Sequence, residues 1–282
     1  MGRGPKQMTE AIIAGWQKEG RGKGEGPKYR PWIEVHDFSS RGRVERTESA
    51  RFGRTIHLMS DVERDTFYAA EWAQPVLDLR EQYPLDRTIT LEIAGALNIR
   101  HPYYPGTNIP TVMTVDFFLK VVRNGVRGYE VIDCKRTEGA EDARSLEKLQ
   151  ITRTYFAGMN IPHRLVFHSQ LPKTKIRNIE WMRDGLIKSG EAERYPGYFR
   201  EKSRIMAHEL ANSTRNMPLN EYCENFEIRH GMSPAEGLRL AKLLMYERTL
   251  LCDLANPNLP SAPLSTFRCV SVSETSIAAG DV

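Results

Sequence analysis

The sequence has 282 residues, enough for one large domain or two of ordinary size, and its 40% hydrophobic and 27% charged residues are typical of a globular protein. A net charge of +4 indicates no particular class of partner, and no stretch approaches the roughly 20 apolar residues of a membrane span. The cysteines fit no zinc module, and the charged, glycine-rich N-terminus lacks the apolar region of a signal peptide, so we expect free thiols and a cytoplasmic location.

Two basic stretches come first in the chain. Residues 5–20 carry apolar side chains at helical spacing and predict an amphipathic helix, followed by an irregular glycine-rich segment over 20–27 and a short strand over 32–35. Residues 1–30 form a basic arm, and a second basic stretch spans 41–54. One interpretation is that both stretches contact DNA phosphates, through Arg21, Lys23, Arg41, Arg43, Arg46, Arg51 and Arg54. The alternative is a solvated tail and loop, which charge alone favours.

A capping box marks the first long helix. Ser60 and Glu63 have the spacing of that motif and predict a helix from residue 61 to about 72. A strand over 76–79, a helix over 87–97 and a loop over 101–106 follow.

A β-hairpin is the clearest local feature of the chain. Asn124-Gly125 separates apolar runs over 111–123 and 126–135, which is the strongest short-range hairpin signal. If these two residues form the turn, Asp116 lies opposite Asp133, and alternation puts Lys135 on the same face as Asp133. Directly opposed side chains lie roughly 5 Å apart, and like charges at that distance repel. A fold would avoid this pair unless a cation held it together.

This arrangement predicts a metal site for phosphodiester cleavage. Mg²⁺ prefers hard oxygen ligands and keeps waters for substrate phosphates, so Asp116, Asp133 and the backbone carbonyl of Cys134 are a suitable set, with Mn²⁺ as a substitute. The metal activates water, and Lys135 positions that water and stabilises the developing charge. The alternative is a structural salt bridge, although Lys135 cannot readily neutralise both aspartates.

Two nearby residues have competing interpretations. Glu63 either only caps its helix, as the local pattern favours, or adds a ligand for a second metal ion, which makes two ions the expected number. His57 is either a general base or a bystander, and the second is more common for a lone histidine in a loop. No P-loop motif is present, so we do not expect the chain itself to bind ATP in that way.

The remaining elements divide the chain into two domains. A helix over 141–158 and a strand over 164–167 complete an α/β domain with a mixed sheet flanked by helices, residues 1–170. Helices over 173–188, 198–212, 219–229 and 233–250, and a hairpin between 251–254 and 265–270, predict a mainly helical, winged-helix-like domain over 171–282. Its polar tail begins at about residue 271.

Several segments resemble the TnsA family, the endonuclease subunits of Tn-seven-type heteromeric transposases. The resemblance covers most of the chain. It is carried by residues 19–24, 31–32, 60–63, 71–72, 76–85, 146–149 and 178–181. The most specific segment is the run Leu-Asp-Leu-Arg-Glu-Gln-Tyr-Pro-Leu that ends at residue 85.

The resemblance implies a restriction-endonuclease-like catalytic domain, a C-terminal winged-helix domain and Mg²⁺-dependent cleavage at the 5′ ends of a transposon. It places the catalytic acids and lysine on Glu63, Asp116 and Lys135, with Asp133 at a position where the family varies. The implied partners are transposon-end DNA, a DDE transposase of the TnsB type that cuts the 3′ ends, and an AAA+ ATPase regulator of the TnsC type bound by the C-terminal region. Two alternatives are a non-catalytic DNA-binding or scaffolding subunit and a stand-alone restriction-type nuclease.

Overall fold

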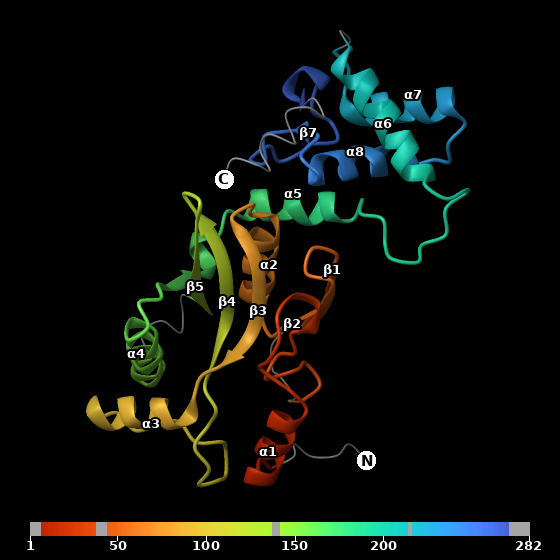
Figure 1. Ribbon diagram of the computed structural model, residues 1–282. Helices are drawn as coiled ribbons and strands as arrows, with labels where there is room; N and C mark the ends of the chain where they lie inside the picture. The colour runs from red at the N-terminus through yellow and green to blue at the C-terminus, as the bar shows by residue number, and fades with distance from the viewer. Residues whose placement is uncertain (1–6, 38–43, 137–141, 214–215, 271–282) are drawn as a thin grey trace. The chain divides into compact units, whose positions relative to one another are not determined.

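The computed structural model describes residues 7–37, 44–136, 142–213 and 216–270 (Figure 1). The chain divides into two compact units, residues 1–171 and 172–282. None of the helices in the described ranges has the length and apolar composition that a membrane span requires.

The first unit is built around a mixed four-stranded sheet in the order β3-β4-β5-β6. The strands β3, β4 and β5 are antiparallel, and β6 runs parallel to β5, which confirms the predicted α/β class. Their bounds are Val76–Pro84 for β3, Thr114–Arg123 for β4, Val126–Lys135 for β5 and His163–Phe167 for β6. Strand β3 is therefore longer than the predicted strand over 76–79.

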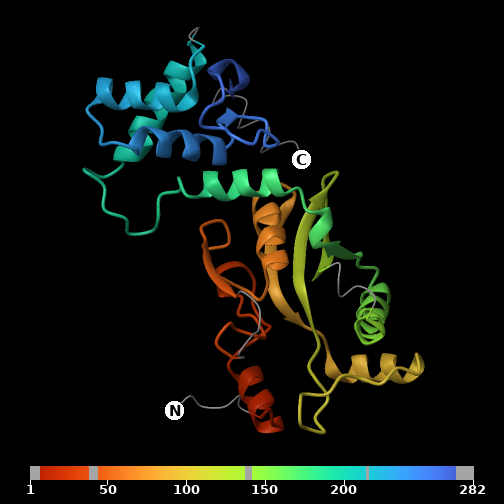
Figure 2. The same ribbon diagram turned by 180° about the vertical axis from the view of Figure 1, so that it is seen from behind.

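Helices cover both faces of this sheet (Figures 1 and 2). Helix α2 (Asp61–Trp72) lies against one face, where Thr66 Oγ1 is 3.4 Å from Cys134 Sγ. Helix α4 (Ala143–Ala157) lies against the other, where Phe156 packs on Phe118 and Val131. Helix α3 (Arg87–Ala96) packs beside α4, and Asp86 caps it. The sheet is thus enclosed, and a carboxylate at its centre needs a partner.

The segment before α2 is ordered, unlike the loop that the sequence predicts there. Strands β1 (Glu45–Ser49) and β2 (Arg54–Leu58) form an antiparallel hairpin, with Ile56 and Leu58 alternating into the core. Arg54 fixes this hairpin to β3 by donating to both carboxylate oxygens of Glu81, at 2.8 and 2.6 Å. The prediction of a loop over 41–54 is therefore wrong for the described part of that stretch.

The N-terminal segment wraps onto the same unit. Helix α1 (Glu10–Lys18) forms as predicted, with Thr9 as its cap, and the short 3-10 helix η1 (Gly26–Lys28) follows the glycines. Gly24 has φ of +94°, and a Cβ on it would lie 2.3 Å from the Lys28 carbonyl oxygen, so the loop requires glycine there. The predicted strand over 32–35 is wrong. The Trp32 N–H donates one hydrogen bond to the Gln82 carbonyl oxygen, but residues 32–35 form no strand of a sheet.

The second unit is mainly helical, with α8 in contact with each of the other three helices. The helix predicted over 173–188 ends earlier, at Arg183, where Gly185 approaches the backbone of α8 closely. The predicted terminal hairpin is confirmed in a shorter form. The bounds are Lys173–Arg183 for α5, Tyr198–Ala211 for α6, Leu219–His230 for α7, Glu236–Tyr246 for α8, Leu250–Leu251 for β7 and Arg268–Cys269 for β8. Its winged-helix character stays a prediction.

Candidate active site

The hairpin forms in the predicted register. Asn124 and Gly125 have φ of 51° and 73°, the left-handed pair that a tight two-residue turn requires. The β4–β5 ladder then runs without a bulge from the pair Arg123 and Val126 to the pair Phe117 and Ile132. Asp116 and Asp133 follow this last pair, so they lie opposite each other where the ladder ends.

Each aspartate accepts a hydrogen bond from the backbone of the opposite strand. The Asp116 N–H donates to Asp133 Oδ1 at 3.3 Å, and the Cys134 N–H donates to Asp116 Oδ2 at 2.6 Å. These side chain–backbone hydrogen bonds therefore take the place of the next backbone–backbone bonds between β4 and β5 and hold the two strand ends together.

The start of helix α2 brings Glu63 to this point. Ser60 Oγ accepts from the Glu63 N–H and donates to Glu63 Oε1 at 3.0 Å, while the Met59 N–H donates to Glu63 Oε2 at 2.9 Å. Glu63 thus does cap the helix, as the local pattern predicts. It is also buried, and burial raises its pKa even though these hydrogen bonds lower it.

The carboxylates interact electrostatically across the two elements. Burial of Asp116, followed by the nearby charges of Glu63 and Asp133, raises the pKa of Asp116 well above the usual range for an aspartate. The charge of Lys135 acts in the opposite direction on Asp116 and Glu63 and does not cancel the effect. Lys135 alone therefore does not offset the cost of ionising these carboxylates together.

Gln82 connects Glu63 to the first residue of strand β4. Its amide nitrogen is 3.3 Å from Glu63 Oε2, and its amide oxygen accepts from Thr114 Oγ1 at 3.1 Å. Its φ of 48° is unusual for a buried residue other than glycine. The neighbours Arg80 and Tyr83, three residues apart, both contact the ring of Phe118, which a regular strand does not allow. The left-handed backbone at Gln82 thus interrupts the alternation of β3 beside Glu63.

Comparison with known proteins identifies the family. The TnsA-like endonuclease N-terminal family matches residues 73–168, and the TnsA endonuclease C-terminal family matches residues 170–254. The transposon Tn7 transposition protein TnsA of Escherichia coli is 36% identical over 182 residues, which are 64% of this chain and 66% of that relative. The chain is a TnsA-like protein. Asp116, Asp133 and Lys135 lie inside the N-terminal TnsA match, whereas Glu63 precedes it.

The donor set of this TnsA-like site fits a hard divalent cation. In the present side-chain arrangement, no three acidic, histidine or cysteine side chains among the described residues converge closely enough to hold a metal ion. Glu63 and Asp116 nevertheless supply two carboxylates that interact with each other, and Mg²⁺ is usually bound by one or two carboxylates together with water and substrate phosphates. In this arrangement Asp133 Oδ1 accepts from the Asp116 N–H, and Oδ2 lies against the imidazole of His163.

The predicted role of Asp133 as a metal ligand therefore stays a prediction. His163 on β6, which no local sequence signal singled out, is the second partner of Asp133, at 2.8 Å. Only the parallel pairing of β5 with β6 brings this histidine to the site, and that pairing is not visible in a local pattern.

Three of the six predicted DNA-contacting arginines have partners within the chain. Arg21 is buried and bonds Asp37 and the Trp32 carbonyl oxygen, while Arg54 bonds Glu81. Arg51 donates to backbone carbonyl oxygens in the last turn of α2 and just after it, those of Glu71, Ala73, Gln74 and Val76. Lys23 and Arg46 are exposed, so they are the better candidates, and Arg41 and Arg43 lie outside the described residues.

Two other candidates, the Cys134 thiol and His57, are engaged by other groups of the unit. The Cys134 thiol faces Thr66 on the opposite side of the sheet, and burial raises its pKa, so it is no nucleophile. His57 Nδ1 accepts from the Val35 N–H at 3.0 Å, which supports the bystander interpretation.

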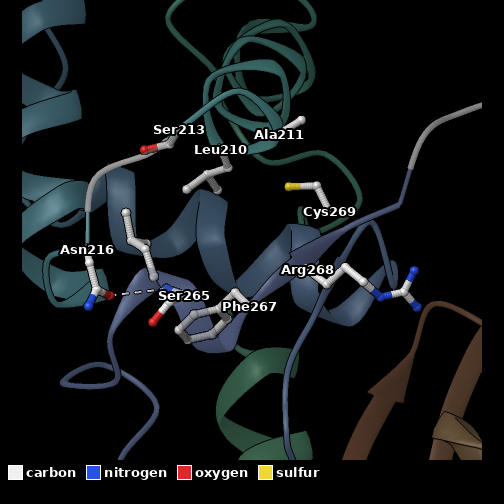
Figure 3. Close-up of a pocket in the computed structure, with 9 residues that line it drawn as sticks. Leu210, Ala211, Ser213, Asn216, Ser265, Phe267, Arg268 and Cys269 are labelled. Atoms are coloured by element: carbon white, nitrogen blue, oxygen red, sulfur yellow. Dashed lines mark hydrogen bonds between the residues drawn. The ribbon is translucent and has the colours of Figure 1, made fainter.

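A pocket in the second unit is not this site. It has a volume of about 350 Å³ and is lined between the end of α6 and the segment around β8 (Figure 3). Its lining contains no carboxylate or imidazole, and Asn216 Oδ1 accepts from the Ser265 N–H across it. It therefore offers neither metal ligands nor an acid–base pair.

Proposed function

We propose that this chain is the DNA endonuclease subunit of a heteromeric transposase and hydrolyses phosphodiester bonds at the 5′ ends of the transposon during cut-and-paste transposition. The observation that carries the proposal is the cluster at the end of the β4–β5 hairpin. There, Asp116 lies opposite Asp133, Glu63 from α2 raises the pKa of Asp116, and Lys135 supplies a positive charge. The matches to the TnsA families support the substrate and reaction type.

Mg²⁺, replaceable by Mn²⁺, is the proposed cofactor, held by Glu63, Asp116 and the carbonyl oxygen of Cys134, with two ions as the expected number. When bound, the metal supplies an activated water and offsets charge on the phosphate. The Lys135 ammonium orients that water and stabilises the charge that develops on the phosphate oxygens. Gln82 holds Glu63, and the Cys134 N–H holds Asp116, so both carboxylates are positioned before DNA arrives.

The proposed partners follow from the family. A DDE transposase of the TnsB type cuts and joins the 3′ ends, and an AAA+ ATPase of the TnsC type binds the C-terminal region. Cutting of both strands releases the element. The exposed Lys23 and Arg46 are the proposed phosphate contacts of the endonuclease unit. The cytoplasm is the proposed location of the reaction.

The test is strand cleavage in the assembled reaction. The purified chain is mixed with TnsB-type and TnsC-type proteins and end-labelled transposon DNA, with and without Mg²⁺. We expect metal-dependent nicks at the 5′ ends, and Asp116→Asn should reduce their rate by about 100-fold or more, since it removes one preorganised charge from the site.

Glu92→Gln is the matched control, because it neutralises an exposed carboxylate on α3 of the same unit. Unchanged nicking by Asp116→Asn would refute the site assignment and favour a scaffolding subunit. Nicking of arbitrary DNA by the chain alone would instead favour a stand-alone nuclease.

A further inference from the structure

Asp133 has both carboxylate oxygens engaged within the sheet. Oδ1 accepts from the Asp116 N–H at 3.3 Å, and Oδ2 lies 2.8 Å from His163 Nε2. The side chains of Asp133 and His163 are only 8% and 7% exposed. Each oxygen of this carboxylate therefore has one partner within the chain.

The fold brings His163 to this place through two strands. In the parallel β5–β6 register, Val131 pairs with His163 and Asp133 pairs with Leu165. His163 consequently shares a face with Val131, and alternation puts Asp133 on that face as well. The ring of Phe156 from α4 lies 6.3 Å from the imidazole, centroid to centroid, and packs against it. The imidazole is thus fixed on one side by packing and on the other by Asp133.

The bonds form a continuous path to Asp116. The imidazole Nε2–H donates to Asp133, which accepts from the backbone N–H of Asp116. Cys134, next to Asp133 on the same strand, donates its own N–H to the Asp116 carboxylate. Movement of Asp133 would therefore change both the backbone and the carboxylate orientation of Asp116.

We propose that Asp133 and His163 form a positioning pair that holds Asp116 in place for metal and DNA, and that Asp133 is not itself a metal ligand. The effect of this pair on catalysis rests on the proposed endonuclease function. The assignment of the residues that bind metal does not rest on that function and can be tested without DNA cleavage. An outer carboxylate–imidazole contact of this kind typically changes metal affinity or activity by about 10- to 100-fold when it is lost.

The first test is metal binding by the full chain without DNA cleavage. Mn²⁺ affinity is measured by electron paramagnetic resonance for the unmodified protein, Asp133→Asn and Asp116→Asn. Asparagine at 133 keeps an oxygen for the Asp116 N–H, and its amide can bond the other tautomer of His163. We expect Asp133→Asn to bind Mn²⁺ within about threefold of the unmodified protein, because the pair keeps its contacts, and Asp116→Asn to lose binding, because Asp116, unlike Asp133, is a ligand. Equal loss in both variants would overturn the proposal.

The second test compares His163→Gln with His163→Met in the assembled nicking reaction. Glutamine keeps an N–H donor within reach of Asp133, whereas methionine has a similar length without one. We expect His163→Met to lower kcat by about 10- to 100-fold at unchanged KM for DNA, and His163→Gln to restore most of it. Equal losses in the two variants would mean that His163 acts only through packing, against the proposal.

Thermal unfolding and hydrogen exchange of the Asp116 amide show whether a His163 variant is folded and whether Asp116 is still held in place. The amide should be protected in the unmodified protein and in His163→Gln, and should exchange faster in folded His163→Met. If the unmodified protein does not nick DNA at all, the proposed function fails. The Mn²⁺ and exchange measurements still decide the positioning pair in that case.

Discussion

Individual residues at this site serve structure and chemistry together. Glu63 caps α2 and also raises the pKa of Asp116, so the capping and ligand interpretations are compatible. The sequence pattern could predict the first role, because a capping box is local. It could not predict the second, since the distance from α2 to the hairpin depends on tertiary packing.

The pH dependence of stability should reveal the carboxylate cluster in the metal-free protein. The pKa of Asp116 is raised in the fold, so the folded state binds more protons than the unfolded state above the usual aspartate pKa of about 3.9. The contribution of Asp116 to stability is therefore favourable at low pH and is lost as the pH rises towards the folded-state pKa. We expect Asp116→Asn to be more stable than the unmodified protein at pH 7, and the difference to shrink towards pH 4.

Urea unfolding of both proteins in a chelator, across this pH range, measures the difference. Addition of Mg²⁺ at pH 7 should stabilise the unmodified protein and not the variant. A stability difference that is the same at every pH would contradict the assignment of the raised pKa to Asp116.

Gln82 offers a second prediction at this scale. Gln82→Met keeps the length of the side chain but removes the amide that contacts Glu63 and Thr114. We expect a loss of about 1–3 kcal/mol in the free energy of unfolding, because buried polar groups lose their partners. We also expect weaker Mn²⁺ binding. Gln74→Met makes the same change at an exposed position and should alter neither quantity. Equal effects in the two variants would show that the Gln82 amide does not support the site.

Among the elements, the β1–β2 hairpin shows why a basic stretch need not be a nucleic-acid surface. Charge and composition predict a solvated loop or a DNA-contacting arm over 41–54. In the structure, alternating residues of β1 and β2 are buried, and Arg51 and Arg54 bind groups of the same unit. The residue composition of a segment cannot distinguish an arginine that binds a phosphate from one that binds a buried glutamate.

Arg54→Met tests this interpretation of the hairpin. The side chain of Glu81 is 0% exposed and that of Arg54 is 7% exposed, so the variant leaves a buried carboxylate without its partner. We expect a loss of about 3–5 kcal/mol in the free energy of unfolding, measured by urea denaturation. Adding Glu81→Leu should recover much of that loss. Arg46→Met, at an exposed position on β1, is the control and should leave stability within about 0.5 kcal/mol. A small loss in Arg54→Met would mean that the hairpin is held by other contacts.

At the scale of the whole molecule, local signals predicted more than long-range pairings. The hairpin turn, the capping box of α2 and the α/β succession of the first unit were all predictable, because each depends on residues close in sequence. The pairing of β6 with β5, the position of His163 and the left-handed backbone at Gln82 were not, because they depend on segments far apart in the chain. The part of the site that sequence reasoning missed is thus the part that holds the carboxylates in place.

The turn of the β4–β5 hairpin determines which residues of the two strands lie opposite each other at the active site. Asp116 lies eight residues before Asn124, and Asp133 lies eight residues after Gly125, so the two arms are equal in length. Inserting one residue into either arm would shift the register and turn one aspartate to the opposite face of the sheet. Arm length, more than the identity of the intervening side chains, therefore sets the distance between the carboxylates. Substitutions in the arms that keep the residue count should therefore leave Asp116 and Asp133 opposite each other.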